Sequence, residues 1–372
     1  RRDGRRKNGR DGILADLSYH DARDIRNAQL LREMLPELPP FCAEFFRGIT
    51  PETTPLTRLN YARDLLIFFD FLLGYKACCA GKTVPEITCD DMAQITMTDI
   101  ETYLDYLTAY TRGGKMLHDD EAAKERKLSS LRALLRYLFK RERIPSNVAA
   151  LVDLPKRHDR EIVRLEVDEV AKLLDLVDEG GKTLTPKQAE YHKKTRLRDL
   201  ALISLLLGTG IRVSECVGLD LNDVDFSVNG FLITRKGGQR VVLYFPEEVA
   251  DVLREYIDER KTIQAQPGHE NALFLSTQKR RMDVRSVQNL VKKYASLVTP
   301  LKHITPHKLR STFGTNLYAE TGDIYLVADV LGHADVNTTR RHYAAQSDEN
   351  RRRAAHSVKL RGDGGSRPPK DD

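Results

Sequence analysis

The stretch RDLALISLLLGTGIRVSE, residues 198–215, decides how the second half of this 372-residue chain folds. The apolar segment from Leu197 to Leu207 predicts a helix that is hydrophobic on all sides and therefore buried. Gly208 and Gly210 end this helix and allow a tight turn. We therefore expect a mainly helical domain, built around a buried helix that stops at a sharp turn.

Polar residues follow this turn directly. Arg212 comes first, Ser214 can cap the next helix, and Glu215 lies close enough in sequence to orient the Arg212 guanidinium. A single arginine after a turn most often has a structural role. The segment therefore indicates a functional site only in combination with others.

A small antiparallel sheet is predicted next. Residues 224–226 form a weak strand, and residues 230–235 and 240–245 form two stronger strands. The four residues between the stronger strands, 236–239, are typical of a hairpin turn. Lys236 in this turn can reach away from the sheet, although a lysine beside two glycines is usually only a solvated turn residue.

The segment TPHKLRSTF, residues 305–313, predicts a helix with Thr305 as N-cap and Pro306 as its first residue. His307 and Arg310 are three residues apart, so they share one face of the first turns. Because a helix N-terminus favours an anion, this pair indicates a phosphate site. Ordinary packing is the alternative interpretation.

The segment LGHADVNTTRRHY, residues 331–343, is the fourth that carries candidate residues. Gly332 ends a helix that begins near Asp323, and His333 lies just past that end. A further helix then carries Tyr343. Taken alone, this tyrosine would be an ordinary core or surface residue.

Together the four segments hold the residue types that phosphoryl transfer needs. Two guanidinium groups can clamp a phosphate and stabilise its developing charge. A cation can donate a proton to the leaving oxygen, histidines can move protons, and a hydroxyl can attack. The candidates are, in chain order, Arg212, Lys236, His307, Arg310, His333 and Tyr343.

These segments resemble the catalytic segments of the tyrosine recombinase (phage integrase) family. The likeness covers about residues 160–355, and the helical first half resembles the family's core-binding domain in type and length. Residues 198–215 and 233–240 and the TPHKLR segment are most similar to Xer-type recombinases, especially the single-recombinase form of some Gram-positive bacteria. The resemblance implies a mainly α, two-domain DNA clamp with a small antiparallel β-sheet, acting as a site-specific DNA recombinase.

The resemblance also implies roles for the residues that bind and attack the phosphate. Arg212 and Arg310 match the phosphate-clamping arginines, and Glu215 matches an acidic residue that supports the site without taking part in chemistry. Tyr343 matches the nucleophile that becomes joined to DNA. It stands ten residues after His333, one of the two spacings found in the family.

The other candidates match residues that handle protons or hold the phosphate. Lys236 matches the hairpin lysine that protonates the leaving 5′ oxygen, and His307 matches a histidine that assists proton transfer. His333 occupies a position, histidine or tryptophan in the family, that holds the scissile phosphate. Ser311 departs from the histidine that often follows the second arginine, which puts no essential role in doubt. No metal or other cofactor is implied.

The first half of the chain predicts helices. Thr57 to Leu73 is amphipathic, and Thr98 with Glu101 predicts a capping box for a helix that runs to about Tyr110. A long helix is predicted from Glu121 to Arg141.

One face of the long helix carries a row of cations. Arg132, Arg136 and Lys140 recur every four residues and therefore stack along the helix. The ordinary interpretation is a solvated face. The functional interpretation, which we adopt as a prediction, is a surface that binds DNA phosphates.

The domain organisation follows from composition. Leu154 to Val163 is charged, contains a proline and is expected to be the interdomain linker. Residues 180–194 are polar and predict a long loop of unassigned contact. The predicted divisions are a flexible basic arm at 1–25, a helical core-binding DNA-binding domain at 26–155, a catalytic domain at 156–360 and a disordered tail at 361–372.

The composition limits the possible classes of protein. Apolar residues make up 41% of the chain, and no run approaches the roughly 18 apolar residues that a membrane helix needs. The basic N-terminal stretch has no apolar segment behind it, as a secretory signal would. The net charge of +6 permits a nucleic-acid partner without requiring one.

The cysteines predict reduced thiols in a bacterial cytoplasmic protein, because their number is odd and their spacing fits no zinc module. They are Cys42, Cys78, Cys79, Cys89 and Cys216.

Three other classes of function are weighed against a recombinase. A type IB topoisomerase uses a similar set of residues, a protein of the same fold could have lost catalysis, and a helical scaffold would have no DNA role. The six filled positions argue against lost catalysis, and their order argues against a scaffold. Chromosome dimer resolution is the predicted role, with integration or excision of a mobile element left open because the chemistry is identical.

The expected partners follow from the resemblance. They are a double-stranded DNA recombination site, three further protomers in a tetramer on two sites, and an accessory DNA-bending or directionality protein. Residues 348–358, which include three successive arginines, are expected to pack in trans against a neighbouring protomer. The expected location is the bacterial nucleoid.

Overall fold

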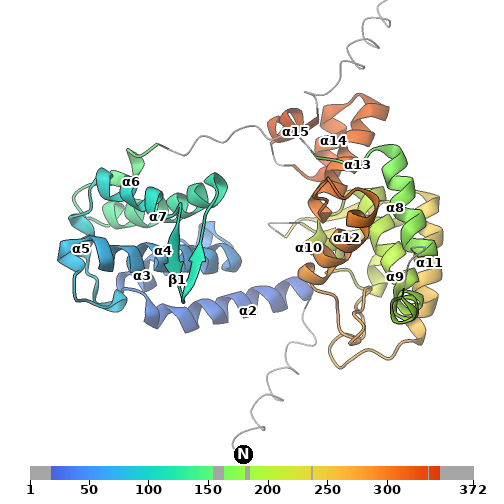
Figure 1. The fold of residues 1–372 in the computed structure, drawn as a ribbon, viewed down its shortest axis with the longest axis horizontal. Coiled ribbons are helices and arrows are strands. Elements are labelled where there is room, and N and C mark those ends of the chain that lie inside the picture. The colour runs from blue at the N-terminus through green and yellow to red at the C-terminus, as the bar shows by residue number, and fades with distance from the viewer. Residues whose placement is uncertain (1–17, 154–162, 181–184, 236–237, 334, 344–372) are drawn as a thin grey trace, which may run out of the picture. The chain divides into compact units, whose positions relative to one another are not determined.

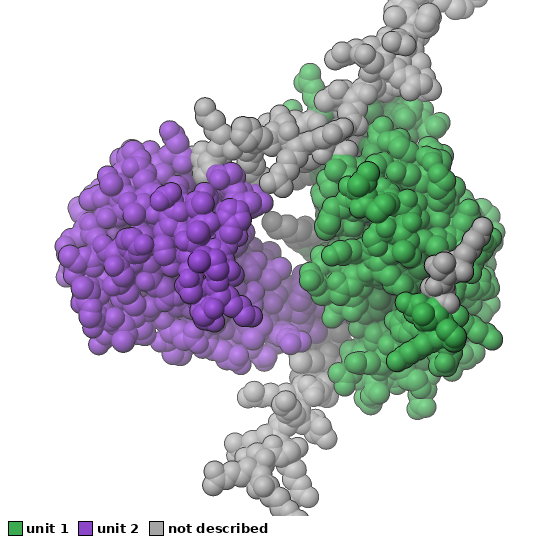
Figure 2. Space-filling model, viewed as in Figure 1, with its two compact units in different colours: residues 1–15, 161–372 green, residues 16–160 purple. Residues whose placement is uncertain are grey.

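The computed structural model describes residues 18–153, 163–180, 185–235, 238–333 and 335–343, with only the backbone of 338 and 341–343. These residues form a mainly helical structure with two small antiparallel sheets (Figure 1), which confirms the predicted fold class. The chain divides into two compact units, residues 16–160 and residues 161–372 with 1–15 (Figure 2). The predicted linker lies almost wholly outside the described residues.

The first unit is a set of helices around one apolar core. Phe69 and Leu131, on the two longest helices, are fully buried in it. Burying the apolar residues of both helices stabilises them. On the helix that carries Leu131 these residues lie on one face, whereas the helix that carries Phe69 is apolar on most of its sides. The helices are α2 (Tyr19–Met34), α3 (Phe41–Gly48), α4 (Pro55–Tyr75), α5 (Cys89–Ala93), α6 (Met97–Tyr106) and α7 (Glu121–Lys140).

Two segments of the first unit differ from the prediction. The flexible arm predicted for residues 1–25 is too long, because α2 begins at Tyr19 and the Ser18 hydroxyl accepts its capping hydrogen bond. Residues near 110 are not helical. They form an antiparallel hairpin of β1 (Tyr110–Arg112) and β2 (Lys115–Leu117).

The N-terminus of α6 is also displaced from its predicted position. Thr96 and Asp99 form the capping box, in which Asp99 accepts from the Thr96 backbone N–H at 2.8 Å. The predicted box of Thr98 and Glu101 is wrong. Both pairs have the spacing of a capping box, and they are offset from each other by two residues. Only Thr96 stands directly before the first residue of the helix.

The second unit holds the long buried helix that the sequence predicts. Leu202, Ile203, Leu205 and Leu206 of α9 are fully buried, and α9 packs against α8, α11 and α13. The helices are α8 (Val167–Glu179), α9 (Pro186–Thr209), α10 (Val213–Cys216), α11 (Glu247–Thr262), α12 (Val284–Val298), α13 (Pro306–Thr321), α14 (Ile324–Leu331) and α15 (Val336–Tyr343).

Helix α9 begins much earlier than predicted. Thr185 is its N-cap, and the Thr185 backbone N–H donates to the Gln188 side chain at 2.9 Å in a capping box. The predicted loop over residues 180–194 is therefore wrong from Pro186 onward. Polar residues fill the first turns of α9 because those turns are largely solvent-exposed.

The three-stranded sheet has the order β3 (Val224–Asp225), β4 (Gly230–Thr234) and β5 (Arg240–Tyr244), all antiparallel. Its strands match the prediction to within one residue. At the turn end of the hairpin, Thr234 pairs with Arg240. The turn residues 236 and 237 lie outside the described residues.

Within the part of the chain that the structure describes, no helix is long and apolar enough to cross a bilayer. All five cysteines are free thiols.

Candidate active site

The turn after α9 fixes the centre of the candidate site. Gly210 ends α9 with a φ of +61°, a left-handed conformation that glycine adopts without strain. A Cβ atom at this position would lie 2.4 Å from the Phe313 ring and 2.9 Å from the Leu331 side chain. Gly210 therefore lets the end of α9 pack directly against α13 and α14.

Arg310 joins the same three helices. It is 5% exposed, and its guanidinium donates to the backbone oxygens of Gly210 and Leu331. These carbonyls lie at helix C-termini, where carbonyl oxygens lack a partner within the helix and partial negative charge accumulates. The guanidinium is therefore held by the backbone of both α9 and α14.

Arg212 is held by two different groups. Its Nη1 donates to Glu215 Oε1 at 3.0 Å, and its Nη2 donates to the backbone oxygen of Gly332 at 2.9 Å. Glu215 is nearly buried, with 6% of its side chain exposed, whereas the Arg212 side chain is 37% exposed. The expectation that Glu215 orients Arg212 is confirmed, and part of the Arg212 side chain faces solvent.

The same carboxylate also caps α10. Glu215 Oε2 accepts from the Arg212 backbone N–H at 3.0 Å, and Arg212 is the N-cap residue. The predicted capping by Ser214 is therefore wrong. The acidic side chain three residues after the N-cap reaches back to the cap instead.

His333 follows the C-terminus of α14. Gly332 ends that helix with a φ of +61°, and the His333 backbone N–H donates to Ala328 at 2.9 Å. The His333 Nδ1 is hydrogen-bonded to Thr339 Oγ1 at 2.8 Å, and Thr339 is fully buried. The imidazole is thus oriented by α15, the helix in which Tyr343 lies four residues after Thr339.

His307 lies in the first turn of α13, the helix that carries Arg310. It is the second residue of α13 and is exposed, and Arg310 follows one turn later. The N-terminal turn of a helix presents backbone N–H groups and partial positive charge, which favour a bound anion. Thr305 stands at the N-cap and Pro306 at the first position, as predicted, although the Thr305 side chain makes no capping hydrogen bond.

The structure therefore joins three of the six candidates through one short segment. Arg212, Arg310 and His333 all meet the C-terminal end of α14, and α13, α14 and α15 lie side by side in Figure 1. Lys236 lies outside the described residues. For Tyr343 the structure gives the backbone position in α15 and nothing of the side chain.

Sequence reasoning missed two residues of this cluster. Thr339 is buried against His333, and Arg235 donates to the backbone oxygens of Asp329 at 3.2 Å and Val330 at 2.8 Å. Arg235 directly precedes Lys236, and Thr339 stands in the same segment as Tyr343. This proximity in sequence to candidate residues was the only available signal, because the contacts that define the cluster form only in the folded chain.

The cationic row of the first unit is divided in its roles. Arg132 donates to the backbone oxygens of Ala149, at 2.9 Å, and Val152, so its guanidinium supports the segment after α7. Arg136 and Lys140 are exposed. Arg136 lines two surface hollows, of about 370 and 540 Å³, one shared with Arg132 and the other with Lys140. Binding of DNA by this row stays a prediction.

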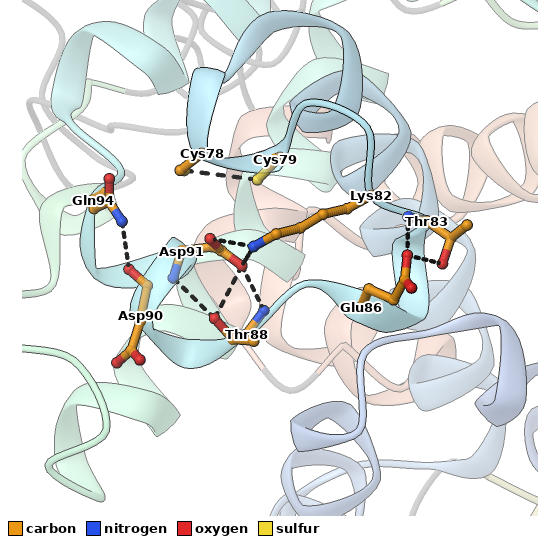
Figure 3. Close-up of polar contacts among 9 residues, drawn as sticks. All are labelled: Cys78, Cys79, Lys82, Thr83, Glu86, Thr88, Asp90, Asp91 and Gln94. Carbon is orange, nitrogen blue, oxygen red and sulfur yellow. Dashed lines mark hydrogen bonds and ion pairs between the residues drawn. The ribbon is translucent and has the colours of Figure 1, made fainter.

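Cys78, Cys79 and Asp91 form a group with the donor types of a metal site (Figure 3). Lys82, however, donates to both Asp91 oxygens, at 2.7 and 2.6 Å. The Thr88 backbone N–H donates to the same carboxylate at 2.8 Å, in the capping box of α5. Burial raises the pKa of the Cys79 thiol to about 12, which keeps it protonated. The group is explained by its structural role.

Known proteins resemble this chain over most of its length. The phage integrase family matches residues 163–350. The tyrosine recombinase XerS of Streptococcus agalactiae serotype III (strain NEM316) is 30% identical over 353 residues, covering 86% of this chain and 97% of its own. XerS of Lactococcus lactis subsp. cremoris (strain MG1363) is 29% identical over 342 residues, covering 85% and 93%.

Solved structures show the same fold. The XerH recombinase bound to a palindromic difH substrate superposes with a TM-score of 0.60 at 22% identity, covering 82% of this chain and 81% of that chain. The Tn1549 transposon integrase in complex with circular intermediate DNA superposes with a TM-score of 0.60 at 20% identity, covering 84% and 98%. The sequence matches, the shared fold and the arginine cluster agree: this chain belongs to the phage integrase family of tyrosine recombinases.

Proposed function

We propose that this chain is a site-specific DNA recombinase in which Arg212 and Arg310 clamp the scissile phosphate. The observation that carries the proposal is that both guanidinium groups are oriented by one helix end, while Arg212 keeps part of its surface exposed. Two oriented guanidiniums can bind phosphate oxygens and stabilise the charge that develops during transfer. They supply the positive charge that a metal ion supplies in other phosphoryl-transfer enzymes, so the mechanism requires no metal. It requires no ATP, because the energy of the broken phosphodiester bond is kept in the covalent intermediate.

The chemistry then follows from the remaining candidates. Tyr343 Oη attacks the phosphorus and loses its proton, with His307 assisting. The bond from phosphorus to the 5′ oxygen breaks, and Lys236 protonates that oxygen. The products are a 3′-phosphotyrosine and a free 5′-hydroxyl, and attack by the 5′-hydroxyl of a partner strand reverses the step. The bond energy is conserved in the covalent link.

His333 holds the scissile phosphate and links it to α15, the helix that carries Tyr343. Its bond to Thr339 fixes the imidazole relative to α15. Residues four apart lie on one helix face, so Tyr343 belongs to the face of α15 that Thr339 presents to His333. This relation supports Tyr343 as the attacking group.

We further propose an Xer-like role in chromosome dimer resolution. The XerS proteins, at 29 and 30% identity over almost their whole length, support this role more than the integrase, which shows the fold alone. The expected assembly is a tetramer on two double-stranded DNA sites, with the two units binding opposite faces of each duplex. An accessory DNA-bending or directionality protein and a place in the cytoplasm, on the nucleoid, belong to the same proposal.

Selection of bound DNA from a random pool, followed by a search of the host chromosome, tests the biological role. A single site near the replication terminus supports dimer resolution, whereas sites at the ends of a mobile element would assign the chain to integration or excision. Plasmids that carry two selected sites as direct repeats should lose the intervening DNA. Relaxation of supercoiled plasmids without such a site would instead indicate a type IB topoisomerase.

The tetramer is tested by truncation before Gln346. The shortened chain should bind a single site with unchanged affinity and fail to bring two sites together. Normal synapsis by the truncated chain would refute the proposed packing of residues 348–358 against a neighbour.

A further inference from the structure

Arg235 holds the turn end of the β4–β5 hairpin to the end of α14. Its backbone N–H donates to the Gln239 backbone oxygen at 2.8 Å, which closes the hairpin. Its Nη1 donates to the Asp329 oxygen at 3.2 Å and its Nη2 to the Val330 oxygen at 2.8 Å. Both carbonyls belong to the last turn of α14, where a cation is favourable.

The contact with α14 is close. A Cβ atom at Gly332 would lie 2.5 Å from Cζ and from Nη1 of Arg235, so the guanidinium lies directly against a backbone that has no side chain there. The Arg235 Nε is buried and has no hydrogen-bond partner among the described residues. Leaving such a donor unsatisfied is unfavourable, and native structures retain few of them without a reason.

Arg235 is one of three arginines that share this helix end. Four successive backbone oxygens, of residues 329 to 332, accept from three guanidinium groups: Arg235 takes the first two, Arg310 the third and Arg212 the fourth. Arg310 comes from α13, and Arg212 follows α9. Only Arg235 comes from the hairpin. It is therefore the group that fixes the position of the hairpin relative to the two phosphate-clamping arginines.

We propose that Arg235 is a positioning residue for the proton transfer to the leaving 5′ oxygen. It acts through Lys236, the next residue in the chain, and the inference rests on the function proposed above. An ammonium on a flexible four-carbon side chain in a glycine-containing turn donates efficiently only if the turn is held near the phosphate. Fixing the residue directly before Lys236 to the helix end that holds Arg212 and Arg310 provides that restraint.

Two DNA substrates separate this role from a purely structural one. Both are nicked suicide substrates, and in one the bridging 5′ oxygen at the cleavage site is replaced by sulfur, whose thiolate leaves without protonation. Losing a positioned proton donor slows a reaction by roughly 10²- to 10⁴-fold. Arg235→Gln keeps Lys236 and only displaces it, so the effect should be smaller. We expect this variant to form adduct roughly 10- to 100-fold more slowly than wild type on the oxygen substrate. On the sulfur substrate its rate should return to within about 3-fold of wild type.

Arg240→Gln is the matched control, because it removes an exposed cation from the facing strand beside the same turn. Its rate relative to wild type should be the same on both substrates. Arg235→Gln combined with Lys236→Ala should be no slower on oxygen than Lys236→Ala alone. If Arg235→Gln unfolds, as melting curves and DNA binding would reveal, Arg235→Lys replaces it with the same expected sulfur rescue.

Equal slowing of the Arg235 variant on both substrates would overturn the inference, since it would mean that Arg235 acts on the phosphate or the fold. That result is distinct from failure of the proposed function. If Lys236→Ala itself gains nothing from sulfur, or if wild type forms no adduct, the proposed chemistry fails and the inference fails with it.

Discussion

Replacing Glu215 by alanine removes one carboxylate that serves two purposes. Its Oε2 caps α10 by accepting from the Arg212 backbone N–H, and its Oε1 accepts from the Arg212 guanidinium, both at 3.0 Å. The first contact stabilises the fold, whereas the second orients a group that we assign to phosphate binding. The substitution should therefore lower both stability and the rate of DNA cleavage.

The two contacts set the size of the effect. Losing a capping acceptor destabilises by about 1 kcal/mol. A charge-assisted bond contributes more in a buried site, but the Arg212 side chain is 37% exposed and water screens the pair, so we assign it about 1 kcal/mol. The total of roughly 2 kcal/mol corresponds to a fall in Tm of roughly 4–8 °C for a unit of this size.

The effect on rate should be smaller than that of removing Arg212. The guanidinium keeps its bond to the Gly332 oxygen, so only part of its orientation is lost. We expect cleavage to slow about 10-fold, equivalent to about 1.4 kcal/mol of transition-state stabilisation. Removing a transition-state donor altogether, as in Arg212→Ala, typically slows a reaction by roughly 10²- to 10³-fold.

The assay measures covalent adduct formation in single-turnover conditions at 25 °C, with Tm measured on the same preparations. Glu169→Ala is the matched control: Glu169 accepts from the Glu166 backbone N–H at 2.8 Å and from Lys302 at 2.6 Å, in a capping box of α8. It should lower Tm without changing the adduct rate. A Glu215→Ala protein that loses stability and cleaves at the wild-type rate would refute the view that Glu215 orients Arg212.

Two further predictions concern the first unit. Neutralising Arg136 and Lys140 together should weaken DNA binding and reduce the slope of log K against log salt by about 1.8, and an unchanged slope would mean that the row is only a solvated face. Asp91→Ala should lower Tm, whereas Asp90→Ala, which removes an exposed carboxylate, should not. Burial raises the pKa of Asp91, but Lys82 and neighbouring donors outweigh it and the net shift is downward. The stability that the Asp91 carboxylate contributes is therefore present above about pH 4 and lost as pH falls through its folded-state pKa. The melting curves of wild type and Asp91→Ala should converge in acid. Curves that stay apart in acid would contradict this prediction.

Most of the fold could be predicted from the sequence, because its signals are local. The buried helix around Leu202, the β4–β5 hairpin and the ends of α13 and α14 depend on apolar spacing, on turn glycines and on a proline at the first helical position. Some of the errors arose where polar composition concealed a helix. The first turns of α9 are one example, although Thr185 and Gln188 already had capping-box spacing.

The candidate site was predictable in its residue types and not in its contacts. Arg310 and Gly210 stand 100 residues apart in sequence, and Arg235 and Val330 stand 95 apart. No local pattern encodes such pairs, because they exist only once α9, α13, α14 and the hairpin have packed. This is why Arg235, whose identity is plain in the sequence, was missed as part of the site.

The central claim is that Tyr343 attacks DNA with charge supplied by arginines. Wild-type protein and Tyr343→Phe are incubated in EDTA with a nicked suicide DNA that carries the selected site, and adducts are separated in denaturant. We predict a denaturant-resistant adduct at the 3′ phosphate for wild type, and none for Tyr343→Phe, which should bind the site equally well. An adduct that persists in Tyr343→Phe, or that forms only with a divalent metal, would contradict the account.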